Sequence, residues 1–162
     1  HQLYSAMNSE KEQVLAELLK NELELLRASV VTLQLSVAKC KLIGQKENYS
    51  FEELESFDSL TSKFSRTSDI FTQKVLRTVW MLMHEGFVPF IDMLDKAEKM
   101  KIIDSADQMI GIRDLRNQIA HEYIPEAIRD LVPEVIDLSS DLLNNIEVGK
   151  QFIGQRGWLN SV

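Results

Sequence analysis

Apolar residues recur every three or four positions along most of the chain, which is the spacing of an α-helix that buries one face. No segment alternates apolar and polar residues with period two, and the hairpin dipeptides Asn-Gly and Asp-Gly are absent. Three prolines and six glycines are too few to interrupt the pattern often. The sequence therefore predicts an all-α protein.

The first half of the chain predicts a long helical hairpin. Ser9 and Glu12 match a capping box at the start of the first helix, and Gly44 marks its end. After a polar turn, Ser50 and Glu53 match a second capping box. The two apolar stripes are Leu15, Leu19, Leu23, Leu26, Val30, Leu33, Val37 and Cys40, then Phe57, Leu60, Phe64, Phe71, Val75 and Leu82. Two helices of about 30 residues joined by so short a turn pack antiparallel, and further helices complete a bundle.

Glycine and proline divide the second half into shorter pieces. Gly86 and Pro89 interrupt the periodic pattern, so a third helix is expected over residues 89–102. Asp104 or Ser105 is placed to cap a fourth helix.

The two remaining prolines and the chain ends set the other predicted limits. Pro125 is expected to close the fourth helix, and Pro133 to separate a short helix from a longer one over residues 133–150. The expected organisation is a flexible arm over residues 1–8, one helical domain over residues 9–150 and a tail over residues 151–162.

Composition is that of a single soluble domain. With 162 residues, 44% of them hydrophobic, the chain can bury one core without disulfides or metal. Its single cysteine, Cys40, excludes an intramolecular disulfide and is expected as a small core residue in a reducing, cytoplasmic compartment. No apolar run reaches the roughly 18 residues that a bilayer requires, and the start lacks the order of a signal peptide. We therefore expect a cytoplasmic protein without membrane contact.

The formal net charge of −7 bears directly on function. Proteins that hold nucleic acid by its phosphates usually display a basic face, and no basic run occurs here, so any RNA contact is expected to be local. Arg66, Asp69, Lys74 and Arg77 on the second helix are interpreted as a solvated or interface face. Because the histidines are scattered and no acidic cluster has ligand spacing, neither a metal nor another cofactor is expected.

The stretch RDLRNQIAHEY, residues 113–123, is the part of the chain least explained by packing. On an ideal helix Arg116 and Tyr123 lie about 20° apart, whereas His121 points about 140° away from Arg116. Arg116 and His121 can converge only if the helix end unwinds before Pro125 or if a second protomer supplies the missing group. A homodimer in which the two copies of this helix face each other is the simpler solution, and it is expected here.

An arginine and a histidine that meet in one cleft can cleave RNA without a metal. A near-neutral imidazole can accept the proton of a ribose 2′-hydroxyl or donate one to the leaving 5′-oxygen. A guanidinium holds the phosphate and its developing negative charge. The products would be a 2′,3′-cyclic phosphate and a 5′-hydroxyl.

The full motif is more specific than its two catalytic positions. Arg-x4-His alone occurs by chance in roughly one chain in six of this length. The stretch RNQIAHEY resembles the Arg-Asn-x-x-x-His-x-Tyr signature of the HepT-like HEPN toxins, the ribonuclease halves of toxin–antitoxin pairs whose antitoxins are minimal nucleotidyltransferases. This resemblance implies a HEPN-type helical bundle over residues 9 to about 150. It further implies that Arg116 and His121 are catalytic and that Asn117 supports the site. Tyr123 would be the residue that the antitoxin nucleotidylates to silence the toxin.

Two other interpretations stay open. In an ordinary helical protein, Arg116 pairs with Asp114 or with a carboxylate on another helix. His121 would then be a solvated helix-end residue and Tyr123 a packing residue at the rim. Alternatively, a non-catalytic HEPN-type helical module that binds a nucleotidyltransferase partner could carry the same motif.

Overall fold

The computed structural model describes residues 2–160, and every regular element in that range is helical. This confirms the predicted all-α fold. The elements are α1 (Gln2–Ile43), α2 (Phe51–Asp69), the π-helix η1 (Ile70–Val75), α3 (Leu76–Leu82), α4 (Phe90–Lys99), α5 (Ala106–Ala120) and α6 (Pro125–Arg156). No helix within the described range is both long and apolar enough to cross a membrane.

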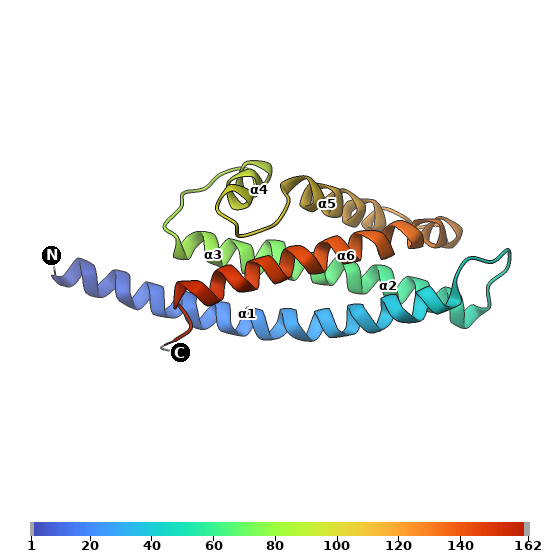
Figure 1. Cartoon of the computed structure of the whole chain (residues 1–162), viewed down its shortest axis with the longest axis horizontal. Helices are drawn as coiled ribbons and strands as arrows, with labels where there is room; N and C mark the ends of the chain where they lie inside the picture. Colours follow the sequence, from blue (N-terminus) through green and yellow to red (C-terminus); the bar gives the residue numbers. More distant parts are fainter. Residues whose placement is uncertain (1, 161–162) are drawn as a thin grey trace.

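The predicted hairpin is formed by α1 and the rod that α2, η1 and α3 build together (Figure 1). Two buried hydrogen bonds show that the two arms run antiparallel. The hydroxyl groups of Ser29 and Thr67 are hydrogen-bonded, and the Thr78 hydroxyl donates to the Glu22 carboxylate, so a later residue of the second arm meets an earlier residue of α1. α6 lies along both arms of this hairpin, while α4 and α5 cover the side of the rod that faces away from α1 (Figure 1). The bundle therefore has α1 at one edge and α5 near the opposite one.

The turn of the hairpin follows the sequence closely. Gly44 has a φ of 67°, the left-handed conformation that commonly follows the last helical residue. Ser50 and Glu53 form the predicted capping box, each side chain accepting a hydrogen bond from the other residue's backbone N–H.

The start of α1 differs from the prediction. Because α1 already contains Gln2, Ser9 lies inside the helix, and the predicted Ser9–Glu12 capping box is wrong. Serine and glutamate are both tolerated on an exposed helix face, so their spacing alone does not fix a helix start. Residues 2–8, predicted as a flexible arm, are the first part of α1, and their described side chains are exposed. His1 lies outside the described residues.

The second arm of the hairpin contains a π-helical turn that the sequence pattern did not predict. In η1 the Leu76 N–H donates to the Phe71 carbonyl instead of the carbonyl of Thr72. The wider turn rotates the helix locally, and Ile70, Phe71, Thr72 and Val75 within it are buried. It begins directly after Asp69, whose carboxylate forms an ion pair with Arg116 of α5.

The last helix is continuous through Pro133, so the predicted break at that residue is wrong. A proline inside a helix costs about 3 kcal/mol because it removes one hydrogen bond and crowds the preceding turn. Leu131, Val132 and Val135 on either side are buried in the core, and each such side chain contributes roughly 1.5–3 kcal/mol on burial. Packing therefore outweighs the proline penalty.

The predicted tail also belongs partly to α6. The helix extends to Arg156, and Gly157 follows it with a φ of 74°. Trp158 and Leu159 then pack against the core. Ser161 and Val162, the end of the predicted tail, lie outside the described residues.

Candidate functional site

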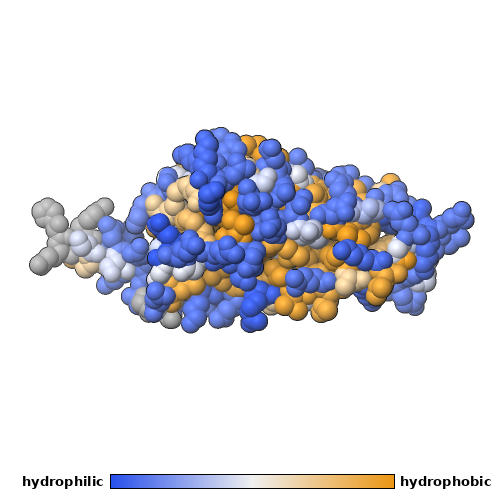
Figure 2. Space-filling model, viewed as in Figure 1, coloured by the Kyte–Doolittle hydropathy of each residue, from blue (hydrophilic) through white to orange (hydrophobic). Residues whose placement is uncertain are grey.

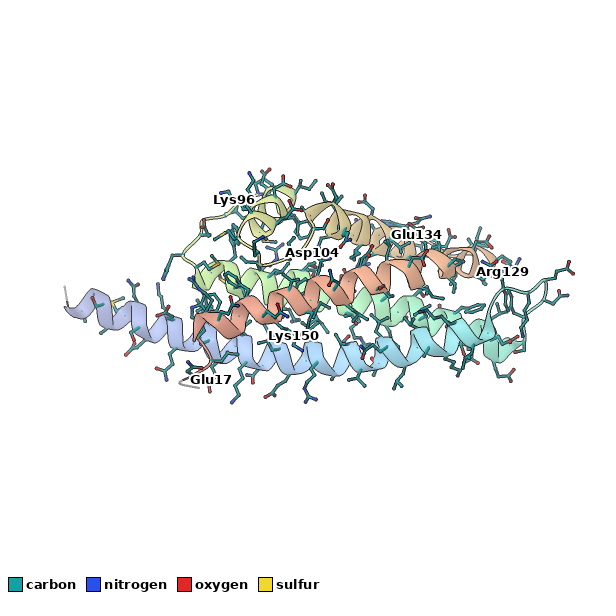
Figure 3. The ribbon with its side chains drawn as sticks, in the orientation of Figure 1. Glu17, Lys96, Asp104, Arg129, Glu134 and Lys150 are labelled. Carbon is teal, nitrogen blue, oxygen red and sulfur yellow. The ribbon has the colours of Figure 1, made fainter. Side chains whose placement is uncertain are left out.

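Two hydrogen-bonding residues fix the N-terminal end of α5, the helix that carries the motif. Of the two predicted capping residues, Asp104 and Ser105, the N-cap is Ser105. Its side chain accepts a hydrogen bond from the backbone N–H of Gln108 at 3.1 Å. Asn145 of α6 is fully buried, and its Oδ1 accepts from the backbone N–H groups of Asp104 and Ser105 at 2.9 and 3.0 Å. Its Nδ2 donates to Gln108. Figure 3 shows Asp104 in the connection between α4 and α5, next to α6. Because Asn145 is buried with its polar atoms bonded, it specifies where α5 starts on α6.

The arginine of the motif forms a bidentate ion pair with a carboxylate on α2. Arg116 Nε donates to Asp69 Oδ1 at 2.9 Å, and Nη2 donates to Oδ2 at 2.8 Å. The hydrogen bond to Asp69 raises the pKa of Arg116 above its ordinary value, so the guanidinium is cationic at all physiological pH values. The sequence allowed a carboxylate on another helix as the partner of Arg116 but did not identify Asp69.

Arg116 and Asp69 lie in an open groove of about 610 Å³ between α5 and the α2–η1 junction, which we call the Arg116 groove. Arg66, Lys74 and Arg116 bring three cationic side chains to it, against the single carboxylate of Asp69. The remaining lining residues are Ser62, Ser65, Ile70, Gln73, Ile119 and Ala120. No basic groove was expected from the sequence, because its cations come from segments far apart in the chain. The groove is locally basic in an acidic protein, and it can accept a phosphate.

His121 does not line the Arg116 groove of the same chain. It is the C-cap of α5, exposed, with a backbone N–H that donates to the Asn117 carbonyl at 3.2 Å. Asn117 is exposed on the last turn of α5 and is likewise not part of the groove lining. Unwinding of the helix end before Pro125 was one of the two ways in which Arg116 and His121 could converge. α5 does end before Pro125, yet His121 does not reach the Arg116 groove of its own protomer.

Tyr123 occupies a different place from the one that an ideal helix predicts. α5 ends at Ala120, so Tyr123 lies in the connection to α6, where the residue is 86% exposed. Tyr123 lines a second groove of about 430 Å³ between α2 and the start of α6. This groove shares Ser62 and Ile119 with the Arg116 groove, so the two are neighbours. The placement of Tyr123 on the helical face of Arg116 is therefore wrong, although the tyrosine lies beside that groove.

Within residues 2–160, no group of three or more His, Cys, Asp or Glu side chains is arranged to hold a metal ion. Comparisons with models of protein families, with curated proteins and with solved structures found no match.

Proposed function

We propose that this protein is a metal-independent endoribonuclease, the toxin of a HepT-type toxin–antitoxin pair in the cytoplasm. One observation carries the proposal: the arginine of the Arg-Asn-x-x-x-His-x-Tyr motif lies in a basic groove, and the tyrosine of the motif lies in the groove beside it. A groove with three cationic side chains supplies the local RNA contact that the net charge of −7 does not provide globally.

Asp69 has a defined part in this proposal. It engages two N–H groups of the guanidinium, and a guanidinium has five, so three remain for the oxygens of a phosphate. The bidentate pair also restricts the rotation of the arginine side chain, so less conformational entropy is lost when RNA binds. Asp69 is thus a positioning residue for Arg116.

His121 acts on RNA held in the groove of a second protomer. Its imidazole accepts the proton of the 2′-hydroxyl as the 2′-oxygen attacks phosphorus. The bond from phosphorus to the 5′-oxygen breaks, and the imidazolium returns the proton to that oxygen. A homodimer in which the α5 ends face each other supplies both the arginine and the histidine to each site.

The antitoxin of this pair is a nucleotidyltransferase that modifies Tyr123. The side chain is exposed enough to enter the active site of another enzyme. A nucleotidyl group on its oxygen adds bulk and negative charge beside the Arg116 groove, where an RNA phosphate has to bind. Modification would then block the site both sterically and electrostatically.

One observation favours a second function, the non-catalytic HEPN-type helical module that binds a nucleotidyltransferase partner. Asp69 already satisfies the strongest interaction of Arg116 within one chain, and His121 lies outside the groove. In that case the groove and Tyr123 would form a docking surface, and the protein would not cleave RNA.

Cleavage of RNA by the purified protein distinguishes the two functions. The matched variants are His121→Asn and His84→Asn, which remove one exposed imidazole each, since His84 also lies at a helix end. Asparagine tolerates the positive φ of 59° at His84. We expect wild type and His84→Asn to cleave RNA in the presence of a chelator, and His121→Asn to lose cleavage by at least about 100-fold. Equal cleavage by all three proteins, or none by wild type, would contradict the ribonuclease proposal.

A further inference from the structure

α1 carries a second apolar stripe on its exposed side, separate from the one that faces the core. Its large members include Met7, Val14, Leu18, Leu25, Leu35 and Leu42, with exposed fractions from 43% at Leu18 to 89% at Leu42. Ala28 continues the row at an exposed position. Figure 2 shows apolar surface reaching the edge of the molecule at which Figure 1 places α1. From Met7 to Leu42 the stripe is about 52 Å long, at 1.5 Å per residue.

The spacing of this stripe is that of a helix that pairs with another helix. Met7, Val14, Ala28, Leu35 and Leu42 are separated by seven residues or by a multiple of seven. Leu18 lies four residues after Val14, and Leu25 lies four residues after position 21, the next position of the same repeat. Steps of three and four that sum to seven define the seam of a coiled coil. The stripe lies about 130° around α1 from the row of buried leucines, so it is not an extension of the core contact.

The charges of α1 are divided between its two ends. Residues 2–24 carry five glutamates and two lysines, whereas residues 25–43 carry Arg27, Lys39 and Lys41 and no acidic residue. Two copies of α1 placed antiparallel bring the acidic half of one onto the basic half of the other, while a parallel pair would bring like charges together. The helix is therefore electrostatically complementary to an antiparallel copy of itself.

We propose that the exposed stripe of α1 binds the same stripe of a second copy of this chain, antiparallel about a twofold axis near Leu25. The contact is isologous, because each end of the stripe faces the opposite end of the partner. A strip about 52 Å long and roughly 10 Å wide on each helix buries about 1,000 Å² in total, the lower limit of a stable interface. The proposal does not rest on the ribonuclease function. It concerns a different surface from the α5 ends, so two such interfaces would build a tetramer or a longer assembly.

Cross-linking between engineered cysteines tests both the contact and its direction. The native thiol gives little background, because Cys40 is buried and burial raises the pKa of its thiol. Met7→Cys and Leu42→Cys are purified separately, mixed, and treated with a short bismaleimide. We expect the mixture to form a cross-linked dimer that neither variant forms alone. Gln34→Cys, exposed on α1 about 140° from the stripe, is the matched control and should stay uncoupled.

Disruption of the stripe gives an independent measurement. Leu25→Glu replaces an exposed side chain, so the fold should be retained, but two glutamates would meet near the axis. The mass of the native assembly in solution should fall by at least half, whereas Gln34→Glu should leave it unchanged. Cross-linking of Met7→Cys or Leu42→Cys with itself would show a parallel pair and overturn the proposal. No cross-link above the Gln34→Cys control, or a mass insensitive to Leu25→Glu, would equally overturn it.

Discussion

Arg116 on α5 and Asp69 on α2, 47 residues apart in the chain, form a two-point ion pair with Nε–Oδ1 and Nη2–Oδ2 distances of 2.9 and 2.8 Å. The pair joins the helix that carries the motif to the residue at which α2 changes into the π-helix η1. It connects two parts of the chain that no local pattern relates, and it sets the direction of the guanidinium in the groove.

The first prediction concerns the strength of this pair. Both side chains are about 30% exposed, which weakens the attraction, but the bidentate geometry favours it, so a coupling free energy of about 1 kcal/mol is expected. A double-mutant cycle with Asp69→Ala and Arg116→Ala in urea measures it. The control cycle uses Arg113 and Asp114, whose single contact is 3.4 Å long and should give a coupling near zero. Equal coupling in the two cycles would mean that the Asp69 pair is not structurally important.

The second prediction concerns Asn145, which positions the start of α5. Asn145→Ala leaves the N–H groups of Asp104 and Ser105 without their buried acceptor, so the free energy of unfolding should fall by roughly 2–3 kcal/mol. Asn144→Ala is the control, because Asn144 is exposed and makes one hydrogen bond of 3.1 Å to Asp104, and it should cost less than about 0.5 kcal/mol. Urea unfolding of both variants checks this. If they lose stability equally, Asn145 does not hold α5 in place.

The third prediction concerns pH and the start of α2. The hydrogen bond from Lys46, followed by that from the Ser50 backbone, lowers the pKa of Glu53. A carboxyl group with a lowered pKa stabilises the fold above its unfolded value of about 4.3, and that contribution is lost as pH falls through the folded pKa. Glu53→Gln should therefore melt below wild type at pH 7, and the gap should close toward about pH 3. Glu47→Gln, at an exposed glutamate of the same turn, should show no such gap. A gap that persists unchanged at low pH would assign the effect to shape and not to charge.

The fourth prediction concerns Tyr123. Incubation with a HepT-type nucleotidyltransferase partner and ATP should add a nucleotidyl group that intact-mass measurement detects, and the modified protein should cleave RNA more slowly. Tyr123→Phe should gain no adduct. Tyr49→Phe is the control and should be modified like wild type, because the Tyr49 hydroxyl is engaged by the Lys46 N–H at 2.9 Å. An adduct on Tyr123→Phe, or full activity of protein modified at Tyr123, would show that this residue is not the regulatory site.

Helix periodicity predicted the architecture because burial of one helical face is a local property of the sequence. The stripes of α1 and of the second arm lie in the core or pack against it, and the Ser50–Glu53 capping box needed only three residues of spacing to be recognised. The uninterrupted α6 could not be predicted in the same way, since the packing that compensates for Pro133 comes from other helices.

The candidate site was predicted only in part, for similar physical reasons. The angles of an ideal helix apply only to residues within the helix. α5 ends at Ala120, so they do not give the position of Tyr123. Asp69 is remote in sequence from Arg116, so no spacing rule pairs them. Arg66, Asp69 and Lys74 were grouped on one face from the sequence, but their meeting with Arg116 depends on how α5 packs against α2, which no local pattern encodes.

A metal-free ribonuclease site that takes Arg116 from one protomer and His121 from another can be tested by mixing two inactive variants. Arg116→Ala and His121→Asn should each fail to cleave RNA in the presence of a chelator. A mixed dimer contains one site with both residues intact, so an equimolar mixture should recover roughly a quarter of the wild-type rate. The recovered products should end in a 2′,3′-cyclic phosphate. A mixture that stays inactive while wild type cleaves, or either variant alone cleaving at the wild-type rate, would contradict this account.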